Sequence, residues 1–393
     1  MKQKKYMLFL FICIFGMFLT ADAKCVLASQ EKTEDEDVPL VADYGEELEY
    51  DEIQKVINEI QNGSEEFNFE EYVNEFVSGE EPFDLSNICS KLANGVLNQI
   101  VIERKTIIQL LAIAVIASVF TNFTNVFQNS HIAETGFYVT YLLLFTLLTT
   151  SFYQVTRIAE GALTTLLDFM KALLPTYFIC ITFSAGAKTS MVFYESTLVL
   201  ITIINVVLIK ILLPLINVYF ILLMANNIMK EDMLSKFAEL LEMVISWSLK
   251  TILGAVVGFN VIQGLVVPVT DYVKQSMMMK TANAIPGVGN AFSSVTETVF
   301  AAGVLIKNSV GAAGLIAIVV ICANPVIKLG IYSLIYKLGA AIVQPISDKR
   351  VLNCINGTAK SARLLVSMVI IAAVLFIFTI VIITTSTNLH LSS

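Results

Sequence analysis

Four charged side chains interrupt long apolar stretches of this 393-residue chain, and they are its best candidates for chemistry: Glu195, Lys210, Lys250 and Lys307. A charge at the centre of a bilayer costs about 2.5–3.5 kcal/mol on insertion scales, so such groups usually face a partner or water. Each lysine either snorkels from the boundary of a span, as the nearby Trp247 suggests for Lys250, or belongs to an internal ion pair or hydrated path. Glu195 cannot snorkel far, which leaves an internal role open.

The sequence contains no pattern typical of an enzyme. It lacks the Gly-x-x-x-x-Gly-Lys loop that cradles phosphates, so any nucleotide energy must come from another polypeptide. The two histidines, His131 and His390, are too far apart to suggest a triad or a metal site by local spacing. Cys25 and Cys89 could pair, although no framework of spacings predicts it. We therefore predict that the chain is not an enzyme and has no cofactor or metal.

Small residues at four-residue spacing indicate places where helices approach closely. Gly254 and Gly258 form a small-xxx-small face, which serves either packing within a bundle or self-association. A second such surface runs from Gly303 through Gly311 to Gly314.

A third group, Pro286, Gly287 and Gly289, precedes that second surface. It lacks the third glycine and the preceding strand of a dinucleotide-binding fingerprint, so it does not indicate a cofactor site. It is more typical of a turn or a broken helix at a membrane boundary.

The elements that position these residues are predicted membrane helices. The chain is 56% hydrophobic and 15% charged, and it is almost continuously apolar between residues 106 and 386. Because about 20 helical residues cross a hydrocarbon core of about 30 Å, the predicted fold is an all-α polytopic membrane protein with a helical transmembrane bundle. The candidate spans are 106–127, 136–156, 172–186, 190–209, 211–226, 243–268, 300–323, 326–345 and 364–386.

Loop charges predict the orientation. Residues 346–363 carry four basic side chains and one acidic one, which predicts a cytoplasmic loop. With an acidic N-terminal domain outside, the number of spans before this loop must be odd, so one of the nine candidates is not a crossing. We expect about eight crossings, with six as the alternative. Residues 230–245 are amphipathic and predict a helix at the headgroup level.

Residues 1–105 predict export. Residues 1–23 have the basic end, apolar stretch and small-residue cleavage site of a signal peptide. Residues 24–105 hold 21 acidic and 6 basic side chains, which predicts a small, acidic, partly disordered helical ectodomain and excludes nucleic-acid binding. This ectodomain is either a solvated spacer or a domain that docks partners. Residues 106–386 form the membrane domain, and residues 387–393 form a short tail.

Particular residues also resemble a known family. The run from Ala284 to Gly289, which includes Pro286 and Gly287, is followed by Glu297-Thr298-Val299 and by Leu305 to Gly311, which includes Lys307 and Asn308. These segments, with the order of signal sequence, acidic exported segment and multi-span body, resemble the stage III sporulation protein AE family of endospore-forming bacteria. The resemblance covers essentially the whole chain, and residues 283–314 are its specific part.

The resemblance implies a role and not a reaction. It implies a polytopic membrane subunit of a secretion-like channel complex between mother cell and forespore, needed for forespore development after engulfment. The implied partners are the other stage III sporulation A-series membrane proteins, their cytoplasmic ATPase and, indirectly, the forespore protein Q. The implied location is the mother-cell membrane around the forespore. The alternative from the residues is a self-contained secondary transporter for a small solute, although no internal repeat supports it.

Overall fold

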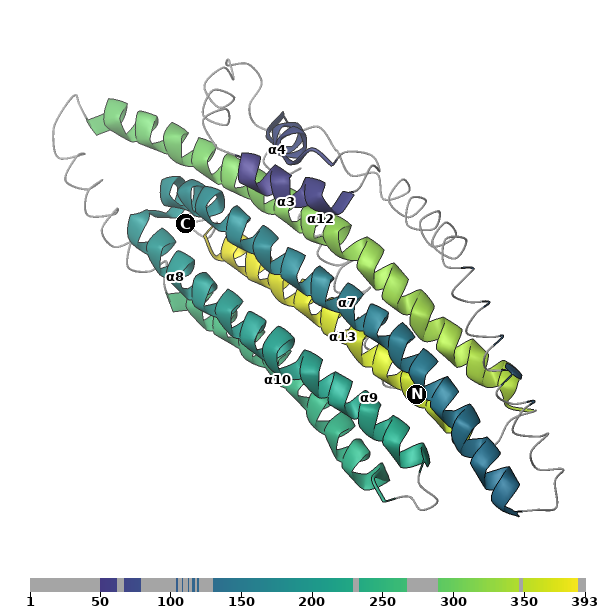
Figure 1. Ribbon diagram of the computed structural model, residues 1–393. Helices are drawn as coiled ribbons and strands as arrows, with labels where there is room; N and C mark the ends of the chain where they lie inside the picture. The colour runs from purple at the N-terminus through teal and green to yellow at the C-terminus, as the bar shows by residue number, and fades with distance from the viewer. Residues whose placement is uncertain are drawn as a thin grey trace. The chain divides into compact units, whose positions relative to one another are not determined.

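The computed structural model describes residues 50–61, 67–78, 130–228, 233–266, 289–345 and 349–387, with a few single residues between 104 and 119. Within these residues all the regular elements are helices, and none is a strand (Figure 1). The all-α prediction is therefore confirmed. The elements are α3 (Asp51–Gln61), α4 (Phe69–Ser78), α7 (Ser130–Ala185), α8 (Ala187–Ile204), η2 (Asn205–Leu212), α9 (Leu213–Ile228), α10 (Ser235–Val266), α12 (Gly289–Val343) and α13 (Lys349–Ser386).

Several predictions fall outside the described residues. These are the signal peptide, the cysteines Cys25 and Cys89, the turn at Pro286 and Gly287, and the tail beyond Thr387. Nearly all of the predicted span 106–127 also lies outside them. The boundaries predicted for the domains stay predictions.

Five described stretches are long and apolar enough to cross a bilayer, so the chain is a multi-pass membrane protein. They are Tyr141–Ala185, Ala187–Ile228, Ser235–Leu265, Phe300–Val343 and Lys349–Ser386. Three pairs of predicted spans are joined in continuous helices: 136–156 with 172–186, 190–209 with 211–226, and 300–323 with 326–345. The predicted count of about eight crossings stays a prediction.

The residues expected to separate these pairs do not interrupt the helices. Pro175 lies inside the 56-residue α7, which is about 84 Å long, and Pro325 lies inside α12. A proline removes one backbone hydrogen bond and kinks a helix, yet tight packing on both sides can hold the two halves in one helix. Tyr177, Phe178 and Leu174 beside Pro175 are all buried.

Near Pro214 the helix continues because the backbone changes from α-helix to π-helix. Eight residues of π-helix, η2, lie between α8 and α9 and end at Leu212, just before Pro214. A proline ring clashes with the carbonyl four residues earlier in an α-helix, and the wider π turn moves that carbonyl of Lys210 aside. The chain from Ala187 to Ile228 therefore continues as one rod.

The core of the bundle lies where α7, α12 and α13 pack together, with α10 against α13 and α9 (Figure 1). Apolar side chains dominate these contacts; Leu166, Val310, Leu365 and Phe376 are essentially inaccessible to solvent. Hydrogen bonds between helices fix the relative positions of the rods. They include Ser151 to Tyr336 at 2.6 Å, Tyr219 to Glu242 at 2.9 Å and Asn260 to Thr379 at 2.9 Å.

The amphipathic segment 230–245 differs from its prediction as a separate helix. Its described part forms the first turns of α10, which continues to Val266 without a break. Phe237 and Leu240 are about half exposed, whereas Ala238, Leu241 and Ile245 are buried. The buried residues face the bundle at helical spacing, so packing against neighbouring helices sets the direction of this segment.

The two short helices of the acidic N-terminal region pack onto the long ones. α3 contacts α7, and α4 contacts α12. The side-chain amide of Gln54 joins the two helices: it donates to the Phe67 carbonyl at 2.9 Å and accepts from the Phe69 N–H at 2.8 Å. Ile53, Phe69 and Val73 are buried, so these helices contribute to the core and expose their acidic faces.

Candidate functional site

The most unusual side chain of the bundle is Lys307, a lysine with no exposed surface in the middle of an apolar segment of α12. Its Nζ donates to the Thr387 hydroxyl at 2.8 Å and to the Thr384 carbonyl at 3.3 Å. A buried amine is costly unless it is hydrogen-bonded, and these contacts provide bonding partners. Lys307 therefore has a built polar environment inside the bundle.

This environment is the carboxyl end of α13. The last four carbonyls of a helix have no partner within it, and the helix dipole makes this end attractive to a cation. Thr387 follows the last residue of α13 and donates its hydroxyl to the Ile383 carbonyl at 2.8 Å, while its oxygen accepts from Lys307. Lys307 thus caps α13 from a different helix and links the two.

Gly311, one helical turn after Lys307, leaves room for a third helix. A Cβ at this position would lie 3.0 Å from the Thr384 hydroxyl and 3.5 Å from the Tyr177 ring. The hydroxyls of Tyr177 and Thr384 are themselves hydrogen-bonded. The polar cluster, defined as Lys307, Gly311, Tyr177, Thr384 and Thr387, therefore joins α7, α12 and α13.

Asn308 lies next to the cluster on α12 and is half-buried. Gly303 and Gly314, on the same helix, also lie at close approaches: a Cβ would be 3.1 Å from Phe183 and 3.0 Å from Leu173, respectively. The small residues of this stretch therefore lie where α7 comes close to α12.

Tyr50, just before α3, lies near Cys180 of α7. It is 6% exposed, stacks at a tilt on Phe69, and its hydroxyl has no hydrogen-bond partner among the described residues. Burial raises the pKa of this hydroxyl, and the nearby Cys180 thiol and Glu70 carboxylate act in the same direction. Tyr50 therefore stays neutral and acts as an apolar anchor.

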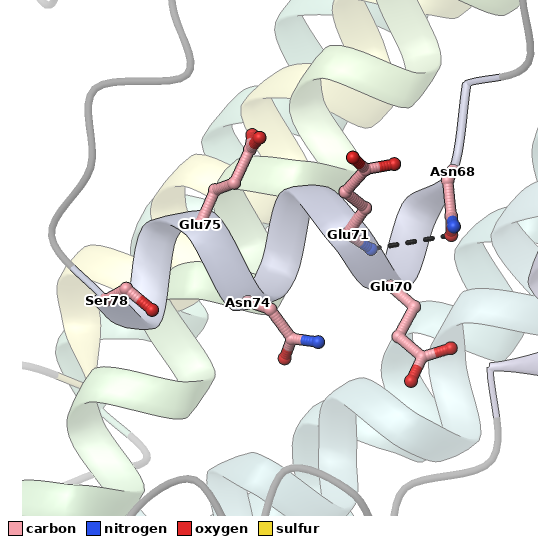
Figure 2. Close-up of a pocket in the computed structure, with 6 residues that line it drawn as sticks. All are labelled: Asn68, Glu70, Glu71, Asn74, Glu75 and Ser78. Carbon is pink, nitrogen blue, oxygen red and sulfur yellow. Dashed lines mark hydrogen bonds between the residues drawn. The ribbon is translucent and has the colours of Figure 1, made fainter.

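The hollow on the outer surface of α4 is a second, weaker candidate. It has a volume of about 540 Å³ and is lined by Asn68, Glu70, Glu71, Asn74, Glu75 and Ser78. Figure 2 shows Glu71 and Glu75 extending to one side of the helix and Glu70 to the other. Diverging carboxylates do not converge on an ion, and no group of metal ligands occurs in the part of the chain that the structure describes. The hollow is an acidic surface and not a chelating site.

The other predicted site residues lie apart from the cluster. Glu195 of α8 and Lys250 of α10 are exposed on the outside of the bundle. Gly254 and Gly258 are also exposed, and a Cβ at either would contact nothing within 4 Å. Their small-residue face therefore has no packing neighbour among the described residues, and self-association stays a prediction. Gly289 is the first residue of α12.

Sequence reasoning missed Tyr177, Thr384 and Thr387. Threonines near the end of an apolar segment are common, because their hydroxyls bond back to the preceding turn, as Thr384 does to Ile380 at 2.8 Å. Only the depth of Lys307 in its own span indicated that some partner had to exist, and the sequence alone does not say which helix supplies it.

The sequence is similar to those of known proteins. The family model described as Stage III sporulation protein AE matches residues 67–387, which is most of the chain. The chain belongs to the stage III sporulation protein AE family. The Stage III sporulation protein AE of Bacillus subtilis (strain 168) is 28% identical over 293 residues, covering 74% of this chain and 73% of the relative. No solved structure matches the chain. Members of this sporulation family are membrane proteins and are not known as enzymes. The match includes α4 and every long helix, so it spans the polar cluster, whereas α3 lies before its first residue.

Proposed function

We propose that this chain is a non-enzymatic, multi-pass membrane subunit of the channel complex between mother cell and forespore, needed for forespore development after engulfment. The observation that carries the proposal is the family match, which runs through α4 and all the long helices. The partners would be the other stage III sporulation A-series membrane proteins with their cytoplasmic ATPase, and indirectly the forespore protein Q. The location would be the mother-cell membrane around the forespore.

Within that complex the polar cluster would hold three rods in one arrangement. Lys307 and Gly311 of α12 meet the end of α13 and Tyr177 of α7 in a buried, hydrogen-bonded contact. Buried polar networks favour one packing over its alternatives, because any other arrangement leaves their groups unpaired. A subunit that supports a channel benefits from such a fixed geometry.

The N-terminal helices would present the docking surface. α3 and α4 bury Ile53, Phe69 and Val73 against the bundle, and they leave Glu70 and Glu71 exposed and Glu75 half-buried. This arrangement supports the partner-docking interpretation over the solvated spacer, because a spacer does not need a buried face.

The test uses an endospore-forming strain in which the tested variant is the only copy of the chain. Deletion should stop forespore development after engulfment while vegetative growth continues. Lys307→Met keeps the apolar length of the side chain and removes the ammonium, so we expect few heat-resistant spores. Lys337→Met, at an exposed position on the same helix, is the matched control and should sporulate normally.

Immunoblotting of membranes separates loss of function from loss of protein. A deletion strain that completes forespore development would overturn the proposed function. Normal sporulation of the Lys307 variant, with normal sporulation of the control, would leave the family role intact but remove the polar cluster from it.

A further inference from the structure

Five basic side chains interrupt the long rods at mid-length, each on a different helical segment. They are Arg157 of α7, Lys210 of η2, Lys250 of α10, Lys328 of α12 and Arg363 of α13. Lys328 is half-exposed, and the other four are exposed. Trp247, which is the single tryptophan of the chain, is 72% exposed and lies one turn before Lys250. Hydrogen bonds between the helices place these residues in two sets, about 9 Å apart along the bundle.

Lys210 and Lys250 lie side by side on antiparallel rods. Tyr219 of α9 bonds to Glu242 of α10 at 2.9 Å. Nine residues back from Tyr219 is Lys210, and eight residues on from Glu242 is Lys250. At about 1.5 Å of rise per residue, the two lysines are at the same level within about 2 Å. Figure 1 shows α9 and α10 running along each other.

Arg157, Lys328 and Arg363 form a second set at a common level. Ser333 of α12 bonds to the Ala359 carbonyl of α13 at 3.4 Å; five residues back is Lys328, and four residues on is Arg363. Ser151 of α7 bonds to Tyr336 of α12 at 2.6 Å; six residues on is Arg157, and eight back is Lys328. These three lie within about 3 Å of one level.

The bond from Asn260 to Thr379 relates the two sets. α10 and α13 run parallel there, with Lys250 ten residues before Asn260 and Arg363 sixteen residues before Thr379. The offset of six residues corresponds to about 9 Å along the bundle. Lysine and arginine side chains reach several ångströms along a surface, so all five charged groups can meet one headgroup layer.

We propose that Arg157, Lys210, Lys250, Lys328 and Arg363 form a basic belt that binds the phosphate groups of anionic lipids in one leaflet. Lysine and arginine are attracted to an anionic leaflet, and guanidinium groups match phosphate oxygens in pairs. Tryptophan is enriched at the same level of membrane proteins, where its ring is apolar and its N–H reaches water. Among the described residues of the long helices, one acidic residue, Glu160, lies near these five basic ones.

The charges on either side of the belt show where the hydrocarbon begins. On the side of Thr384, the segments 190–209, 251–266, 300–323 and 364–386 contain two charged residues, Glu195 and Lys307. Twenty residues such as 190–209 are about 30 Å long, the thickness of a hydrocarbon core. On the other side, α10 and α13 carry Lys236, Glu239, Glu242, Lys349, Arg350 and Lys360, whereas residues 135–156 of α7 and all of α9 carry no charge.

α7 is an exception, because it carries charged residues on the Thr384 side of the belt, but these charges neutralise each other. Its part beyond the belt holds Asp168 and Lys171, which form an ion pair at 2.9 Å. By the charges of α10 and α13, the hydrocarbon covers the Thr384 side of the bundle except where α3 and α4 pack on α7 and α12, and the opposite ends of α10 and α13 project out of it. If the loop 346–363 is cytoplasmic, as its charges predict, the belt lies in the cytoplasmic leaflet; the binding of lipid phosphates does not depend on that orientation.

The fluorescence of Trp247 can report the depth of the belt in the bilayer and the lipids beside it, in the full-length wild-type chain. The purified protein is reconstituted into vesicles that contain phosphatidylcholine or phosphatidylglycerol brominated at defined acyl positions. We expect bromines near the headgroup to quench Trp247 most, and brominated phosphatidylglycerol to quench at least about twofold more than brominated phosphatidylcholine at equal mole fraction.

Two triple variants identify the residues responsible. Lys210→Gln, Lys250→Gln and Arg363→Gln together should abolish the preference for phosphatidylglycerol and keep the depth of Trp247. Lys188→Gln, Lys236→Gln and Lys349→Gln together remove the same charge from exposed positions away from the belt, and should retain the preference. Strongest quenching at the bilayer centre, no quenching by either lipid, equal quenching by both, or an equal loss in the two triple variants would each overturn the proposal.

Discussion

At the scale of single residues, the protein places one lysine where it is fully enclosed and others where they meet the surface. Lys307 bonds to the end of α13, while Lys250 and Lys210 are exposed at mid-rod. The sequence presented all three as charges in apolar stretches. What separates them is the position on the helix circumference relative to α7 and α13, which depends on packing between distant segments.

The same contrast separates the glycines of α12 and leads to a prediction. Gly311→Ala would put a Cβ 3.0 Å from the Thr384 hydroxyl, so Thr384 must shift slightly and its hydrogen bond with Tyr177 is disturbed. We expect a loss of stability of about 1–3 kcal/mol, because overpacking a tight contact displaces its neighbours. The measurement is the thermal unfolding midpoint of the purified chain in detergent.

Gly330→Ala is the matched control on the same helix. A Cβ there would contact nothing within 4 Å, and alanine lowers the entropy of the unfolded chain relative to glycine. This variant should be as stable as the wild type or more stable by up to about 1 kcal/mol. If the two alanine variants unfold at the same temperature, the close contact at Gly311 does not affect the stability of the chain.

At the scale of elements, the helices could be predicted and their continuity could not. Hydropathy located apolar segments such as 190–209 and 211–226, because burial in lipid or protein requires apolar side chains all round. Lys210 and Pro214 looked like a break between them. Instead η2 widens the backbone before Pro214, and Lys210 reaches the surface from a continuous rod. A break depends on how the neighbouring rods hold the two halves, which local sequence does not contain.

The small-residue patterns illustrate the same limit. The stretch from Gly303 to Gly314 and the pair Gly254 and Gly258 have comparable sequence patterns. The first lies against α7 and α13, whereas the second faces outward with open space around it. The pattern predicts that a close approach is possible, and the arrangement of the other helices decides whether a neighbour is present.

The hairpin of α3 and α4 gives a prediction at this scale. Gln54→Ala removes the amide that bonds to both Phe67 and Phe69, leaving two partly buried backbone groups without that partner. We expect a loss of about 1–3 kcal/mol in the local stability of the hairpin. Hydrogen exchange followed by mass spectrometry should show faster exchange in α3 and α4 and unchanged exchange in α13.

Lys55→Ala is the control for this experiment, since Lys55 is the next residue of α3 and is exposed. Its exchange profile should match that of the wild type. Equal protection of the hairpin in both variants would show that apolar burial of Ile53 and Phe69, and not the Gln54 bonds, holds α3 and α4 together.

At the scale of the whole molecule, the number of long rods bears on the orientation. Four of the five candidate spans precede the basic loop 346–363. With the predicted span 106–127 they become five, which is the odd number that an external acidic domain and a cytoplasmic loop require. This supports the alternative of six crossings. It also places Ala185 and Thr387, at the ends of α7 and α13, on the outer side, where α3 could meet α7.

That orientation predicts which side of the membrane reaches three exposed lysines. Lys188 follows the end of α7, Lys236 begins α10, and Lys349 begins α13. Each is replaced by cysteine in turn, and intact protoplasts and inverted vesicles are treated with a membrane-impermeant maleimide. Cys25 and Cys89 of the predicted external domain are first replaced by serine, and the buried Cys180, Cys322 and Cys354 should contribute little background. With six crossings, Lys188→Cys should react in protoplasts alone, and the other two should react in inverted vesicles alone. The opposite pattern would invert the molecule in the membrane, whereas labelling of Lys188→Cys and Lys236→Cys from the same side would mean that the rod from Ala187 to Ile228 does not make a single crossing.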